Sequence, residues 1–181
     1  MKNNTLNPKN LKTVQTALLC SAAIVVSFVE SLFPYVLPVP GAKLGLANII
    51  TAVAIDALGF VPGLCIVISK ALFALLTRGV LAGVMSFSGS ALSMLVMYLF
   101  IKSKFLFGYL GIGVSGALAH NTGQFVVAYF VCGRAVIYYI PVLLITSALT
   151  GCVSGIALGI LSTKLIKTMN FMKSGAKTKH T

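Results

Sequence analysis

Three polar side chains stand close together in a stretch that is otherwise apolar. His120, Asn121 and Gln124 lie within the run from Phe105 to Cys132, and an imidazole and two carboxamides can donate and accept hydrogen bonds. Burying such groups in hydrocarbon is unfavourable unless each finds a partner. They are therefore expected either to bind a ligand in a cavity or to brace neighbouring helices. On a helix, Gln124 shares a face with His120 and also with Asn121.

Cationic and hydroxyl side chains are expected near the same level of the membrane. Lys43 precedes the second apolar segment and Arg78 follows the third, and both favour an anionic or electron-rich group on a ligand. Glu30 could instead neutralise Lys43, which would leave the pocket roughly neutral. Ser86 and Ser90 are expected at the same boundary. The predicted ligand-binding residues, in a pocket open to the outside, are Lys43, Asn48, Arg78, Ser88, His120, Asn121 and Gln124.

Several kinds of catalytic chemistry are excluded. Glu30 and Asp56 are the only acidic residues, so the chain cannot supply an aspartate-rich magnesium site. It has no Walker motif, and its GxGxxG match at Gly111–Gly116 does not follow a strand or open a helix in a βαβ unit. The four cysteines stand singly, without a CxxC pair. We therefore expect no enzyme activity, no cofactor and no metal site.

The composition is that of an integral membrane protein. Hydrophobic residues make up 58% of the 181 residues, only 9% are charged, and the mean hydropathy is +1.01. No soluble domain could bury so much apolar surface. The apolar stretches have the length of spanning helices and lack the alternation of a barrel. The basic residues behind the net charge of +12 are not gathered into one face, so no nucleic-acid partner is expected.

We predict an all-α fold in which six helices cross the lipid bilayer at residues 13–163, between basic tails at residues 1–12 and 164–181. The expected spans are Thr13–Phe33, Leu46–Phe60, Gly63–Thr77, Phe87–Ile101, Phe105–Cys132 and Ile137–Thr163. The Gly- and Ser-rich stretch Arg78–Ser90 is expected to lead into the fourth span. With both termini in the cytoplasm, ten lysines lie inside, against Lys43, Arg78 and Arg134 outside.

Small residues mark two faces where helices could approach closely. The last span carries two overlapping GxxxG steps, formed by Gly151, Gly155 and Gly159, which we interpret as helix packing. The first span carries a smooth face that suits a helix of the bundle or of a partner protein, formed by Ala17, Ser21, Ala22 and Ala23. Lys70 in the third span is expected to pair with Asp56 on the neighbouring helix.

Three motifs resemble a known family. They are VPGAKLGLAN at residues 39–48, SFSGSALS at residues 86–93 and SGALAHNTGQ at residues 115–124, followed by Tyr139-Ile140-Pro141 and Thr150-Gly151. Over residues 13–163 the chain is similar to the bacterial family called Gx transporter, also described as heptaprenyl diphosphate synthase component I. That family resembles the substrate-binding S components of energy-coupling factor (ECF) transporters, which are six-helix membrane proteins.

This resemblance implies a multi-pass protein of the bacterial plasma membrane. Such a protein would bind a vitamin or related small molecule from the extracytoplasmic side and dock on a transmembrane coupling protein with two ATPases. The face from Ala17 to Ala23 resembles the docking surface of S components. Two alternatives stay open: a membrane subunit of a flavin- or quinone-linked electron-transfer assembly with a redox partner, and an accessory subunit of heptaprenyl diphosphate synthase.

Overall fold

The computed structural model describes the backbone of residues 8–32, 45–103 and 108–177, and the side chains of residues 10–32, 45–103 and 108–163. This part of the chain is helical, without strands, which confirms the predicted all-α class there. The elements are α1 (Pro8–Ser31), α2 (Asn48–Leu58), α3 (Phe60–Arg78), α4 (Val80–Lys102), α5 (Gly108–Cys132), the 3₁₀-helix η2 (Gly133–Tyr139) and α6 (Ile140–Lys177).

Glycines with positive φ separate successive helices. Gly59 (φ 96°) divides α2 from α3, and Gly79 (φ 90°) divides α3 from α4. A Cβ at either position would have no heavy atom within 4 Å, so the backbone conformation, and not crowding, favours glycine. Pro62 lies in the first turn of α3, where its missing N–H is tolerated. The helix therefore begins at Phe60, before the predicted start at Gly63.

The predicted start of the fourth helix is wrong. α4 begins at Val80, and the Gly- and Ser-rich stretch that follows is helical instead of forming a connection. Its glycines allow close packing, since a Cβ at Gly83 would lie 2.8 Å from Leu75 Cβ and one at Gly89 would lie 2.9 Å from His120 Cε1. The small residues of this stretch therefore mark a contact face of a membrane helix.

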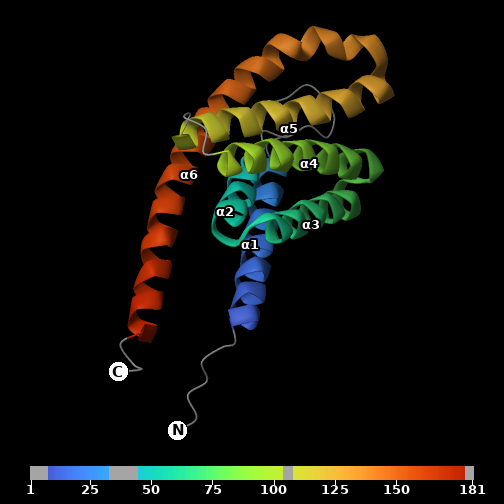
Figure 1. The fold of residues 1–181 in the computed structure, drawn as a ribbon. Coiled ribbons are helices and arrows are strands. Elements are labelled where there is room, and N and C mark those ends of the chain that lie inside the picture. The colour runs from blue at the N-terminus through green and yellow to red at the C-terminus, as the bar shows by residue number, and fades with distance from the viewer. Residues whose placement is uncertain (1–7, 33–44, 104–107, 178–181) are drawn as a thin grey trace.

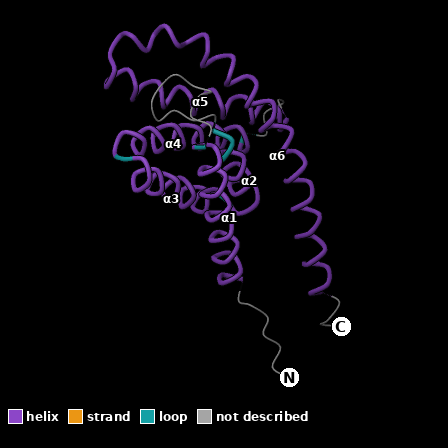
Figure 2. Tube along the Cα trace, turned by 180° about the vertical axis from the view of Figure 1, so that it is seen from behind, coloured by secondary structure: helices purple, strands orange, loops and turns teal. Residues whose placement is uncertain are grey.

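Neighbouring helices alternate in direction. Asn48 at the start of α2 bonds Lys70, whereas Ile55 near its end packs on Gly63, so α2 and α3 are antiparallel. The same reversal relates α3 to α4, α4 to α5, and α5 to α6. Figure 1 shows α3, α4 and α5 stacked side by side, with α1 and the C-terminal half of α6 at a steep angle to them. The N-terminal end of α1 and the C-terminal end of α6 project on the same side (Figures 1 and 2).

In the part of the chain that the structure describes, four helical segments are long and apolar enough to cross a membrane: Asn10–Ser31, Phe60–Arg78, Val80–Lys102 and Gly108–Thr163. Their surfaces carry many exposed leucine, valine, isoleucine and phenylalanine side chains, as lipid contact requires. α2 has only 11 residues, so its length is about 16 Å, roughly half the hydrocarbon thickness of a bilayer. Because the residues from Thr51 to Ile55 are all buried, α2 is an internal helix.

The last two helices pack through their glycines. A Cβ at Gly151 would lie 2.6 Å from Val114 Cα, and one at Gly155 would lie 2.6 Å from Leu110 Cα. The packing predicted for the GxxxG steps is thus confirmed at Gly151 and Gly155, whereas Gly159 makes only an ordinary contact. Gly113, from the GxGxxG match, packs against the backbone of Gly155. Helix packing therefore explains this glycine without a nucleotide.

Candidate functional site

His120 and Gln124 form a buried pair on one face of α5. Their Nε2 atoms lie 2.9 Å apart, a hydrogen bond in which the amide donates and the ring nitrogen accepts. The two side chains are 3% and 2% exposed. The spacing of four residues predicted that Gln124 could share a face with His120, and the structure shows this arrangement.

The imidazole of His120 is held between two glycines from other parts of the chain. Gly45, with φ 86°, precedes α2, and a Cβ there would lie 2.8 Å from His120 Cδ2. On the other side, a Cβ at Gly89 of α4 would lie 2.9 Å from both Cε1 and Nδ1 of the ring. Any larger residue at either position would displace the ring, so these glycines fix its place between α2 and α4.

Asn121 faces a different helix. Its Nδ2 donates a hydrogen bond of 2.7 Å to Ser147 Oγ on α6, away from the pair formed by His120 and Gln124. A cavity of about 160 Å³ adjoins Asn121 between α5 and α6, and apolar side chains such as Leu118 and Phe125 line most of it. The three polar residues of the sequence motif therefore lie on two faces of α5, not around one pocket floor.

A second buried polar group lies between α2 and α3. Lys70 Nζ donates a hydrogen bond of 2.7 Å to Asn48 Oδ1, and both residues are buried. The predicted pair of Lys70 with Asp56 is wrong, because the antiparallel register places Asn48 beside Lys70, and Asp56 lies two turns further along α2. We define Glu30, Asn48, Lys70 and Arg78 as the ionic centre.

Glu30, in the last turn of α1, joins that helix to the segment before α2. Its Oε1 accepts a hydrogen bond from the backbone N–H of Leu46, and its charge acts on both Lys70 and Arg78. Glu30 and Lys70 are functional candidates that are not among the ligand-binding residues predicted from the sequence. The signal was present, because an ionisable residue within an apolar span is costly and is usually kept for function.

The remaining predicted ligand residues are dispersed. Arg78 ends α3 and is half-buried, with no hydrogen-bond partner for Nε and Nη2 among the described residues. Ser88 Oγ donates to the carbonyl oxygen of Gly123 at 2.9 Å and so joins α4 to α5. Lys43 lies outside the described residues.

The small-residue face of α1 is divided between surface and interior. Ala17, Ser21 and Ala22 are exposed, whereas Ala23 is fully buried against Ala54 and Ile66. A groove of about 590 Å³ runs beside Ala17, between α1 and the start of α3. Ala23 therefore packs within the fold, and only the other three residues are accessible.

Besides those of Arg78, buried polar atoms without a hydrogen-bond partner occur on several described helices, α1, α2 and α4 among them. In the described part of the chain they include Glu30 Oε2, Asn48 Nδ2, Thr51 Oγ1, Ser90 Oγ and Ser93 Oγ. Each costs about 1–3 kcal/mol relative to a bonded group. A polar molecule that bonded any one of these atoms would lower the cost of burying that atom.

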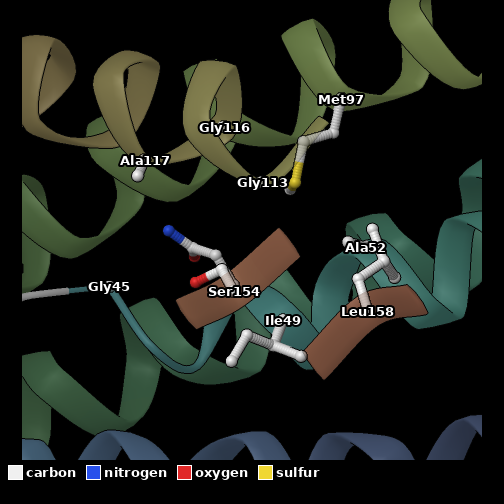
Figure 3. A pocket seen from close by; sticks show the side chains of 10 residues that line it. Gly45, Ile49, Ala52, Met97, Gly113, Gly116, Ala117, Ser154 and Leu158 are labelled. Carbon is white, nitrogen blue, oxygen red and sulfur yellow. The ribbon is translucent and has the colours of Figure 1, made fainter. Parts of the chain in front are cut away.

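The interior is closed at the level of Asn48. Where α2, α4, α5 and α6 meet, a cavity of about 10 Å³ adjoins Asn48, which is room for about one water molecule. Figure 3 shows Met97 and Ser154 on opposite sides of it. A larger ligand could enter here only after the helices separate. Among the described residues no three of the types His, Cys, Asp and Glu gather to hold a metal, and the four cysteines are free.

Comparison with known proteins gives one match. A family model described as heptaprenyl diphosphate synthase component I matches residues 19–162, which confirms the resemblance based on the motifs. Neither a search of curated proteins nor one of solved structures found a match. The matched region includes the ionic centre and the pair His120 and Gln124.

Proposed function

The chain belongs to the heptaprenyl diphosphate synthase component I family, and from this premise we propose that it is the membrane-embedded, substrate-binding subunit of a small-molecule importer. It resembles an ECF S component in this role, and a partner supplies the energy. Six helical segments form the unit within the bacterial plasma membrane, and both termini face the cytoplasm.

The alternating helix directions support this topology. If the start of α1 and the end of α6, which project on the same side (Figure 1), face the cytoplasm, alternation of six segments assigns the end of α1, the start of α2 and the end of α3 to the outer side. Glu30, Asn48 and Arg78 stand at these three positions. The ionic centre then lies in the outer half of the membrane, where a ligand arriving from outside would meet it.

The observation that carries the proposal is the buried ionic centre with its unpartnered polar atoms. Lys70 is 3% exposed inside an apolar helix, and Asn48 beside it keeps an unbonded amide nitrogen. Groups that only brace helices would be expected to bond each other fully, because each unmade bond destabilises the fold. Incomplete bonding of buried donors and acceptors is what a ligand site requires before the ligand binds.

Within this proposal the predicted residues take different parts. Arg78, Asn48, His120 and Gln124 bind the ligand together with Lys70. Ser88 braces α4 against α5. Asn121 reaches the separate cavity beside α6, and Lys43, which lies outside the described residues, is left out of the proposed ligand site.

The partner surface is on α1. Ala17, Ser21 and Ala22 are exposed and small, and the groove beside Ala17 gives room for the side chains of a second helix. We propose this face, without Ala23, as the docking surface for a transmembrane coupling protein.

A second candidate function follows from the family description. In that reading the chain is an accessory membrane subunit, and the catalytic component of a heptaprenyl diphosphate synthase is its partner. Two acidic residues cannot form the magnesium site of such an enzyme, so catalysis would belong entirely to that component.

Deletion of the gene separates the two functions. Mass spectrometry would compare the small molecules in the growth medium and in cells of the deletion strain, complemented with the wild-type chain or with Lys70→Met. An importer predicts one compound that stays in the medium, with uptake restored only by the wild type. Unchanged uptake of all compounds together with shortened prenyl chains would support the accessory subunit and contradict the importer.

A further inference from the structure

Arg78 presents an unused fork of two N–H groups. Its Nε and Nη2 atoms are buried and have no hydrogen-bond partner among the described residues. These two groups lie on one edge of the planar guanidinium, where their parallel N–H bonds match the two oxygens of a carboxylate or phosphate. A point cation such as lysine would not offer this geometry.

Lys70 lies on the same stripe of α3. It precedes Arg78 by two helical turns, roughly 12 Å along the axis, and Ala74 stands between them. Ala74 is fully buried, and its side chain is a single methyl group, shorter than the two side chains on either side of it. A compact molecule that entered along this stripe as the helices separate would meet Arg78 at one end and Lys70 and Asn48 at the other.

The charges of the ionic centre do not balance. Lys70 and Arg78 contribute two positive charges, and Glu30, whose field reaches both, contributes the single carboxylate. One Glu30 oxygen is engaged by the backbone of Leu46, and the other has no hydrogen-bond partner among the described residues. An uncompensated positive charge is unfavourable at low dielectric, so one further negative charge would stabilise the centre. A dianion such as a phosphate monoester would leave an excess of negative charge.

We propose that the ligand is a small organic monocarboxylate whose carboxylate binds the Nε and Nη2 edge of Arg78, with the rest of the molecule lying toward Lys70 and Asn48. This inference rests on the proposed function and names the chemical class of its substrate. Glu30 competes with the ligand for the same cations and holds the end of α1 on Leu46 while the site is empty.

The test uses the full chain in lipid nanodiscs and two matched sets of probes: hexanoate, hexanamide and hexyl phosphate, and benzoate, benzamide and phenyl phosphate. Each set keeps the hydrocarbon part constant and changes only the polar group. Thermal unfolding is followed with each probe at millimolar concentration. We expect at least one carboxylate to raise the midpoint temperature, with little effect of its amide and a weaker effect of its phosphate ester.

Variants locate the effect. Arg78→Lys keeps the charge but loses the fork, so the apparent Kd of the carboxylate should rise roughly tenfold, whereas Arg134→Lys, in the exposed η2 segment, should leave it unchanged. Glu30→Gln should tighten binding, a result that a purely structural role would not give.

Equal stabilisation by the amides, preference for the phosphate esters, no response to any carboxylate, or an unchanged Kd in Arg78→Lys would each overturn the inference. The uptake experiment on the deletion strain tests the importer function independently of the ligand class. If the transported compound were neutral, the importer function would hold and only the carboxylate ligand would be contradicted.

Discussion

Lys70 and Asn48 join α3 to α2 through a buried hydrogen bond of 2.7 Å between Nζ and Oδ1. The contact fixes the antiparallel register of the two helices and places the lysine charge beside the first turn of α2. Because Asn48 directly follows the segment that contains Gly45 and Leu46, the same contact connects the ionic centre to His120. The ionic centre and the pair His120 and Gln124 are thus joined by the short segment of residues 45–47.

Removing the amide should destabilise the fold. Asn48→Ala leaves the Lys70 ammonium buried without its bond, and we expect the free energy of unfolding to fall by about 1–3 kcal/mol. Unfolding in mixed micelles with increasing denaturing detergent measures this change. Adding Lys70→Met should recover part of the loss, since no charge then needs a partner. If the stability loss of the double variant equals the sum of the two single losses, Asn48 and Lys70 are not coupled. Lys102→Met, at an exposed position, is the control.

The glycine before α2 should be less replaceable than the one after it. Gly45 and Gly59 both have positive φ, so alanine at either costs about 1–3 kcal/mol in backbone strain. Only at Gly45 would the new methyl group also overlap a side chain, that of His120. Gly45→Ala should therefore lower stability by about 1–3 kcal/mol more than Gly59→Ala. Equal losses in a thermal unfolding assay would show that His120 does not occupy this contact.

The GxxxG steps of α6 should respond unequally. Gly155→Ala places a methyl group 2.6 Å from Leu110 Cα, a backbone atom that cannot rotate away, whereas at Gly159 the nearest atom is 3.5 Å distant in the Tyr109 ring. We expect Gly155→Ala to separate α5 from α6 and lower the unfolding temperature. Gly159→Ala should change it little. Comparable effects of the two substitutions would contradict the close approach at Gly155.

Two adjacent alanines on α1 should behave differently. Ala22 is exposed, so Ala22→Trp should leave the fold intact and weaken binding of the coupling protein, measured by copurification from membranes. Ala23 is fully buried against Ala54 and Ile66, so Ala23→Trp should reduce the amount of folded protein. Normal copurification of Ala22→Trp would remove this face from the docking proposal.

The sequence predicted the features that depend on composition and helical spacing. Membrane character, the close packing of Gly151 and Gly155, and the burial of His120 and Gln124 all follow from hydropathy and from residues three or four positions apart. Such features need no knowledge of how distant helices meet.

The features that the sequence did not predict depend on register between helices. The partner of Lys70 is decided by how α2 lies along α3, and a shift of two turns separates Asn48 from Asp56. Asn121 likewise faces a different helix from His120 because of where α6 packs on α5. The start of α4 was misplaced because glycine and serine serve both turns and close packing, and local sequence does not distinguish the two uses.

Native mass spectrometry of the full chain, released from membranes of cells in which it is expressed, tests most directly whether the ionic centre binds a small molecule. We expect a fraction of the wild-type chain to carry one bound small molecule, and we expect that mass difference to be lost in Lys70→Met but not in Lys102→Met. Wild-type spectra without any bound small molecule, or the same bound mass in all three chains, would contradict it.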